Sequence, residues 1–97
     1  IPIGVSYDSD LDKVSKIVMQ VAMELHSKMD EINKDSQPSF KFRAFGESSI
    51  DLAVYLRGNK YGDQNPIIHE FIKLIHKRFE KENIEIPFPV RTIIQNK

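Results

Sequence analysis

Three aspartates at alternate positions near the start of the chain are the side chains best spaced for chemistry. Asp8, Asp10 and Asp12 have the spacing with which a calcium-binding loop begins. That loop also requires glycine at its sixth position and glutamate at its twelfth, where this chain has Lys13 and Met19. Carboxylates also stabilise the positive end of a helix dipole. We therefore interpret the cluster as the cap of a helix and not as a metal site.

The histidines do not have the spacing of a metal site either. His69 and His76 are seven residues apart, whereas two histidine ligands on one helix are usually three or four residues apart. His26 belongs to a different predicted helix. The chain has no cysteine, which excludes thiolate ligands, disulfides and a cysteine nucleophile. No nucleophile–base pair, acid pair or glycine-rich phosphate loop occurs, so we expect no cofactor and no enzymatic activity.

A basic and aromatic set of side chains follows the predicted hairpin. The alternation of the two strands places these side chains on the sheet face that points away from the helices: Lys41, Arg43, Phe45, Tyr55 and Arg57. RRM domains bind RNA on such a face, with aromatic residues on their third strand. Here that strand has Asp51, which repels phosphate, and Ala53, which cannot stack on a base. We therefore expect no nucleic acid partner and favour contact with another protein.

Composition and length narrow the class of protein. Ninety-seven residues fit a single domain over residues 1–97. Lys plus Arg and Asp plus Glu number 14 each, so the total charge gives no long-range attraction to nucleic acid or to an anionic membrane. No apolar run approaches the ~20 residues that a transmembrane helix needs. The chain begins with Ile1 and shows no signal peptide, so we expect it to be a piece of a longer protein.

Apolar periodicity predicts six elements in the order β-α-β-β-α-β. Strands are predicted over residues 1–7, 40–45, 50–57 and 84–92, and helices over residues 11–32 and 66–82. The first helix should begin near Ser9, with Asp12 completing an approximate capping box. The second should be capped by Asn65, followed by Pro66. Asn83 can adopt the left-handed conformation that ends this helix, with Ile84 packing back.

The same periodicity predicts which side chains are buried. The apolar stripe of the second helix is predicted to consist of Ile68, Phe71, Ile72, Ile75 and Phe79. Across all elements, we expect the following core residues: Val5, Val14, Val18, Val21, Leu25, Leu52, Val54, Phe71, Ile75, Ile86 and Phe88.

The last predicted strand determines the sheet order. Pro87 and Pro89 are two residues apart, so both lack an N–H on the same edge, which we expect to face outward from the sheet. Right-handed crossovers then give a four-stranded sheet in the order 4-1-3-2, with both helices on one face. The predicted fold class is α+β, a ferredoxin-like βαββαβ sandwich.

Three segments of the chain are similar to motifs of one protein family. Residues 3–10, Ile-Gly-Val-Ser-Tyr-Asp-Ser-Asp, are similar to its hydrophobic-Gly-Val-x-Tyr-Asp-x-Asp motif. Residues 45–50, Phe-Gly-Glu-Ser-Ser-Ile, are similar to Phe-Gly-Asp-Ser-Ser-Ile/Val. Residues 84–92, Ile-Glu-Ile-Pro-Phe-Pro-Val-Arg-Thr, are similar to Ile-Glu-Ile-Pro-Phe-Pro-Gln-Arg-Thr, with Asn83 in place of the preceding glycine and Val90 in place of the glutamine. Together, the three segments resemble the C-terminal cytosolic α/β domain of the small-conductance mechanosensitive ion channel (MscS) family.

The resemblance implies a role in a membrane channel. Family members form a ring of identical subunits, typically a homoheptamer, which opens under membrane tension and releases ions and small osmolytes after hypo-osmotic shock. This chain would be one element of the cage, or vestibule, on the cytoplasmic side of the cell (inner) membrane. The transmembrane helices would lie outside it, so its own contact with the membrane would be indirect. The alternative is a free-standing ferredoxin-like binding or RNA-binding module.

Contact with neighbouring subunits is expected at the sheet edges, at the open sheet face and after the last strand. The candidate subunit-interface residues are Phe45, Tyr55, Pro87, Pro89, Arg91, Thr92, Ile93 and Ile94.

Overall fold

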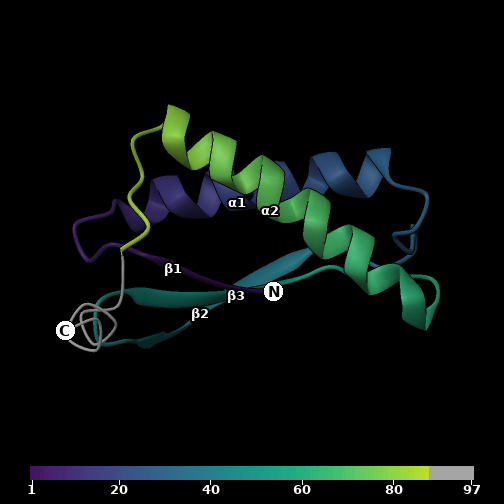
Figure 1. Cartoon of the computed structure of the whole chain (residues 1–97), viewed down its shortest axis with the longest axis horizontal. Coiled ribbons are helices and arrows are strands. Elements are labelled where there is room, and N and C mark those ends of the chain that lie inside the picture. Colours follow the sequence, from purple (N-terminus) through teal and green to yellow (C-terminus); the bar gives the residue numbers. More distant parts are fainter. Residues whose placement is uncertain (88–97) are drawn as a thin grey trace, which may run out of the picture.

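The structure, a computed structural model, describes residues 1–87 and contains one sheet with two helices on one of its faces (Figure 1). The two helices run in opposite directions over the sheet (Figure 1). The elements are β1 (Pro2–Val5), α1 (Leu11–Lys28), β2 (Ser39–Phe45), β3 (Ile50–Tyr55), the 3₁₀ helix η1 (Tyr61–Asp63) and α2 (Gln64–Lys81).

The sheet has three strands in the order β1-β3-β2, and both pairings are antiparallel. This confirms the α+β class and the predicted neighbours of the first three strands. The fourth predicted strand is not seen: residues 84–87 belong to no strand, and Phe88 to Thr92 lie outside the described residues.

The backbone of the last described segment explains why the predicted edge strand fails at its start. The Ser6 N–H donates to the Glu85 carbonyl over 2.9 Å, so Glu85 turns its backbone toward the free edge of β1. In an extended segment, the residue two positions on faces the same edge, and here that residue is Pro87. Since Pro87 has no N–H, it cannot continue the ladder. At Glu85 and Pro87, this differs from the predicted orientation, in which the proline side faces outward; Pro89 lies outside the described residues.

Ile86 was expected in the core, and this is also wrong. Its side chain is 44% exposed. Period-two alternation buries a side chain only where the segment is paired into a sheet that another layer covers, and residues 84–87 are not paired in this way. Ile84, by contrast, packs against the core.

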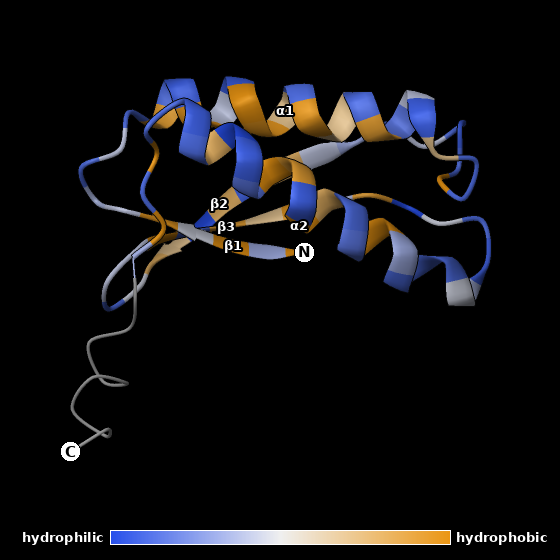
Figure 2. Ribbon diagram, turned by 45° about the horizontal axis from the view of Figure 1, so that its top comes forward, coloured by the Kyte–Doolittle hydropathy of each residue, from blue (hydrophilic) through white to orange (hydrophobic). Residues whose placement is uncertain are grey.

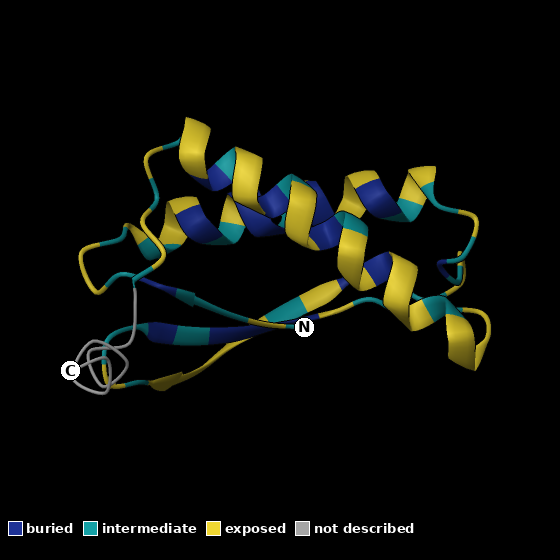
Figure 3. Ribbon diagram, in the orientation of Figure 1, coloured by how far each residue is buried: buried dark blue, intermediate teal, exposed yellow. Residues whose placement is uncertain are grey.

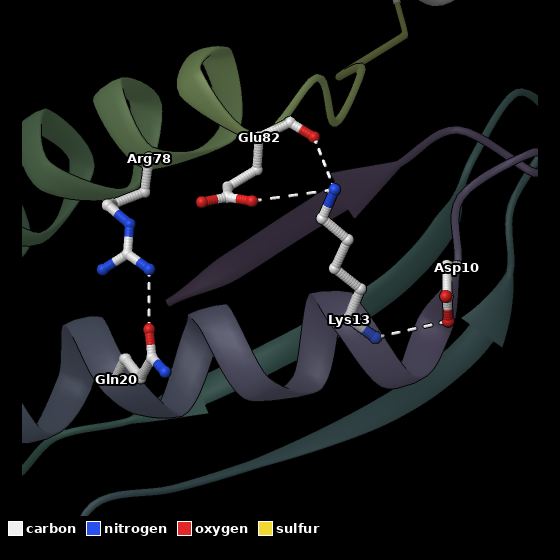
Figure 4. Close-up of polar contacts among 5 residues, drawn as sticks. All are labelled: Asp10, Lys13, Gln20, Arg78 and Glu82. Atoms are coloured by element: carbon white, nitrogen blue, oxygen red, sulfur yellow. Dashed lines mark hydrogen bonds and ion pairs between the residues drawn. The ribbon is translucent and has the colours of Figure 1, made fainter.

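The start of α1 is set by Asp10, one residue later than the predicted capping box. Its carboxylate accepts the backbone N–H group of Asp12 at 3.1 Å and that of Lys13 at 3.3 Å. Figure 4 shows the contact with Lys13. A side chain that satisfies two free helix N–H groups is a sufficient reason for the helix to begin there.

The end of α1 comes at Lys28, before the predicted end at Ile32. Met29 is already extended, and the Lys34 ammonium donates to its carbonyl over 2.9 Å and also to that of His26. Ile32 is fully buried, but in an isolated bridge with Gly58 and not on the helix. The predicted helix was therefore too long, because Ile32 is apolar and buried at helical spacing although it lies outside the helix.

The buried stripe of α2 shares Phe71, Ile75 and Phe79 with the predicted one, but it contains Ile67 in place of Ile68 and Ile72. Its buried residues follow at four-residue spacing: Ile67, Phe71, Ile75 and Phe79. Ile68 is 37% exposed and Ile72 is 53% exposed. The sequence pattern placed both in the stripe, because successive isoleucines fit either rotation. Exposed and buried positions alternate along α2 accordingly (Figure 3).

The two ends of α2 differ in how well they were predicted. The helix begins at Gln64, directly after η1, slightly earlier than the predicted start beside Pro66. At the other end, Asn83 has φ 60°, as predicted for a left-handed cap. Its N–H donates to the Glu80 carbonyl at 3.3 Å, and the Ile84 N–H donates to the Phe79 carbonyl at 2.8 Å. This is the Schellman arrangement, which satisfies carbonyls at a helix end.

The core lies between the helices and the sheet face that they cover, where the apolar residues of both layers meet (Figure 2). Nine predicted core residues are at most 4% exposed: Val5, Val14, Val18, Val21, Leu25, Leu52, Val54, Phe71 and Ile75. The cluster also contains Ile17, Ala22, Ile32, Ile50, Ile67 and Phe79. Phe88 lies outside the described residues.

Two polar contacts join α1 to α2 at the surface (Figure 4). The Lys13 ammonium donates to the Glu82 carbonyl at 2.9 Å and lies 3.7 Å from the Glu82 carboxylate. The Arg78 guanidinium donates to the Gln20 side-chain oxygen over 2.6 Å. Exposed pairs of this kind contribute at most about 1 kcal/mol each, so they help to align the helices while the core supplies most of the stability.

Replacing two neighbouring isoleucines on α2 tests its rotation. We expect Ile67→Ala to lower the free energy of unfolding by about 2–5 kcal/mol, because it leaves a cavity in the core. Ile68→Ala removes the same atoms from an exposed position, so its effect should stay below about 1 kcal/mol. Urea unfolding followed by circular dichroism measures both, and equal losses would contradict the rotation.

Candidate functional site

The described residues contain no centre for chemistry. Among residues 1–87, no polar or charged residue is buried, and no group of three or more His, Asp or Glu side chains is placed to hold a metal ion. Asp10 caps α1, and the His69 ring lies 3.9 Å from the exposed Glu70 carboxylate. In the same range, no helix is both long and apolar enough to cross a membrane. The exposed surfaces of the described residues are therefore the remaining candidate sites.

The most exposed phenylalanine described lies where the β2–β3 turn meets the segment after β1. The Phe45 side chain is 80% exposed, and its ring stacks on that of Tyr7 with 6.3 Å between centroids and 13° between planes. The Tyr7 hydroxyl donates to the Gly46 carbonyl, which holds the two segments together. We call this surface, with the exposed carboxylates of Asp8 and Glu47, the aromatic end.

Two glycines allow the segments of the aromatic end to approach closely. The Ser49 hydroxyl donates to the Asp51 carboxylate at 2.6 Å. A Cβ on Gly4 would lie 2.9 Å from the Ser49 hydroxyl oxygen, and a Cβ on Gly46 would lie 2.8 Å from the Asp51 carboxylate. Both distances are shorter than ordinary contacts. The motif segments near residues 3–10 and 45–50 are therefore complementary halves of one contact.

A β-bulge changes which face Phe45 occupies. The register of β2 against β3 shifts between Phe42 and Ala44, so Phe45 pairs with Ile50. Directly paired residues point to the same face, and Ile50 belongs to the core under the helices. The prediction that Phe45 lies on the open face is therefore wrong, because it assumed a regular strand. Tyr55, which neighbours the inward-facing Val54, remains on the open face and is 46% exposed.

The open sheet face contains a shallow depression of about 750 Å³. Small residues from all three strands line it, including Pro2, Gly4, Ala44 and Ala53. Larger side chains around it include Tyr55, Ile86, Pro87, Arg43 and Asp51. The depression exists because the central positions of this face lack long side chains, and its mixed lining fits protein contact better than binding of one charged ligand.

A second depression, of about 820 Å³, lies where the start of β1 and the end of β3 meet the start of α2. Its lining residues include Ile1, Arg57, Tyr61 and Ile68. The Ile1 backbone nitrogen donates to the Val54 carbonyl over 2.8 Å.

The predicted interface residues fall into two groups. Phe45, Tyr55 and Pro87 are described, and they are exposed or half-buried. Those that lie outside the described residues are Pro89, Arg91, Thr92, Ile93 and Ile94. The sequence pattern missed Ile68 and Ile72 as surface residues. The unbroken four-residue spacing from Ile67 to Phe79 was the signal that could have revealed them.

Comparison with known proteins identifies the family. The profile described as "Mechanosensitive ion channel MscS, C-terminal" matches residues 1–86. An "Uncharacterized MscS family protein" of Haemophilus influenzae is 32% identical over 88 residues, which cover 91% of this chain and 8% of that protein. A second one, from Buchnera aphidicola, is 32% identical over 87 residues, which cover 90% of this chain and 27% of that protein. The chain belongs to the MscS family and corresponds to its C-terminal domain. The family consists of channel proteins and is not a family of enzymes.

Adding a methyl group to Gly4 tests the close approach at the aromatic end. We expect Gly4→Ala to lower the free energy of unfolding by about 1–3 kcal/mol, because the new Cβ displaces Ser49 from Asp51. Gly62→Ala is the matched control, since no atom lies within 4 Å of its added Cβ. Thermal unfolding by calorimetry measures both variants. A Gly4→Ala variant as stable as the control would refute this account.

Proposed function

We propose that this chain forms part of the cytoplasmic cage of a mechanosensitive channel that releases ions and small osmolytes on hypo-osmotic shock. The observation that supports this most directly is the family match over residues 1–86. The aromatic end adds to it, because two of the three motif segments contact each other there. A contact that both motifs serve explains why those residue types occur together.

The proposed role is structural. The helices cover only one sheet face, so within residues 1–87 the open face, the aromatic end and one edge of α2 stay exposed and could contact other copies of the subunit. A subunit in a ring needs such surfaces on both sides, because each copy has two neighbours. We propose a homoheptamer at the inner membrane, with residues 1–97 as a single cage domain and the membrane-spanning helices in other parts of the subunit.

The relatives support a longer subunit. The chain spans less than a third of the length of either relative described above, at 8% and 27%. Tension sensing and conduction would then belong to regions outside this chain, and residues 1–97 would contribute assembly and the shape of the cage. The residues proposed for subunit contact beyond the described part remain Pro89 and Arg91 to Ile94.

A chimeric channel tests this function. Residues 1–97 replace the corresponding C-terminal region of an MscS-family channel, expressed in bacteria that lack their own mechanosensitive channels. We expect the chimera to restore survival after hypo-osmotic shock, to give tension-activated current in membrane patches and to have the mass of a ring in detergent. A chimera that reaches the membrane but stays monomeric would refute the proposal.

Two variants control the chimera. Leu52→Asp places a charge in the core, where Leu52 is 1% exposed, and should abolish both survival and current. Tyr61→Ser changes a side chain that is 91% exposed and should leave both unchanged. If Leu52→Asp retained full function, the domain would not be needed in folded form, and the structural role would be wrong.

A further inference from the structure

We propose that neighbouring copies of this chain contact each other head to tail, with the aromatic end of one copy against the α2 edge of the next. The α2 edge is the surface formed by Ile68 and Ile72 with the adjacent His69 and Lys73. The inference rests on the proposed function for its ring, while the contact itself can be tested on the chain alone. The proposed partner of each of these two exposed surfaces is a second copy of the same chain.

The α2 edge exposes apolar area that residues 1–87 do not cover. Ile68 and Ile72 are one turn apart on the same side of α2 and are 37% and 53% exposed. The side chains of His69 and Lys73 are 69% and 61% exposed. Burial of two isoleucines favours association, and adjacent exposed aliphatic side chains are typical of contact surfaces.

The aromatic end combines exposed apolar area with negative charge. The Phe45 ring stacks on the Tyr7 ring, and this contact holds the exposed Phe45 side chain in position. Asp8 and Glu47 are exposed beside these rings. No lysine or arginine occurs from residue 1 to 12 or from residue 44 to 56, so no basic side chain in either segment offsets these carboxylates.

The two surfaces are complementary in charge. Lys73 contributes a positive charge to the α2 edge, and the exposed Lys77 follows one turn further along the same helix. Glu70 lies 3.8 Å from the Lys73 ammonium, but exposed pairs of this kind are weak and can exchange for a partner's carboxylate. Pairing an aromatic end with a second aromatic end would instead bring carboxylates together. Unlike surfaces therefore pair more favourably than like surfaces.

Contact between unlike surfaces is heterologous and leaves one free aromatic end and one free α2 edge in each pair of copies. Repetition of such a contact closes into a ring when the rotation between copies allows it. The first half of α2 and the β2–β3 turn lie toward opposite ends of the molecule, whose longest extent is 44 Å (Figure 1). Head-to-tail contact is therefore compatible with a neighbour on each side of every copy.

Disulfide cross-linking tests the contact, because the chain has no cysteine of its own. Glu47→Cys and His69→Cys chains are mixed under mild oxidation, and the products are identified by peptide mass. We expect the mixed 47–69 disulfide to form roughly tenfold faster than that of a control mixture of Glu47→Cys with Met23→Cys, because contact raises the effective concentration of the two thiols. Met23 is a matched control, since it is 43% exposed on α1.

A charge reversal provides the second measurement. Lys73→Glu should reduce the rate of 47–69 cross-linking severalfold, and Asp8→Lys in the other partner should restore it. Cross-linking at the control rate, or preferential formation of like-with-like disulfides, would overturn the proposed contact. A Lys73→Glu variant that cross-links as fast as the chain with Lys73 would also overturn the proposed contact.

The same cysteine pair in the chimeric channel separates the two proposals. A chimera that conducts but shows no preferred 47–69 disulfide would leave the cage function standing and refute this contact. A chimera that fails to assemble, while the isolated chains still cross-link between positions 47 and 69, would refute the cage function and support the contact.

Discussion

The packing of both helices against one face of β3 holds the described part of the chain together. Leu52 and Val54 on β3 and Phe71 on α2 are at most 1% exposed, and Val14 and Val18 on α1 are fully buried. β3 is the central strand, so it joins β1 and β2 to the same core. Removing this contact would leave each element with an uncovered apolar face, because the described residues provide no other layer for it to pack against.

The one-sided cover also determines where function can lie. The helices protect one face, and the other face has small residues along its centre and Tyr55 near one end. The β1–α1 connection and the β2–β3 turn meet beyond the sheet, where Tyr7 and Phe45 stack. A domain of this kind offers several contact surfaces on a rigid support, which is what an element of an assembled wall requires.

The proline motif shows how a correct principle can give a wrong orientation. Prolines do belong at positions where no ladder bond is needed, and the sequence therefore predicted an outward-facing proline edge. The bond from Ser6 to Glu85 turns that edge toward β1 instead, and Pro87 then cannot extend the pairing. The sequence identified the residue that lacks an N–H donor. Only the tertiary contact decided which strand that residue faces.

By itself, the sequence determined the α+β class, the order of the first five elements, the left-handed Asn83 cap and most of the core, because these depend on local periodicity and backbone chemistry. The family was also recognisable from three short motifs. Only the tertiary structure decided the rotation of α2, the end of α1, the face of Phe45 and the exposure of Ile86. Each of these depends on which surface lies opposite a residue, and the spacing of residues along the chain does not specify that surface.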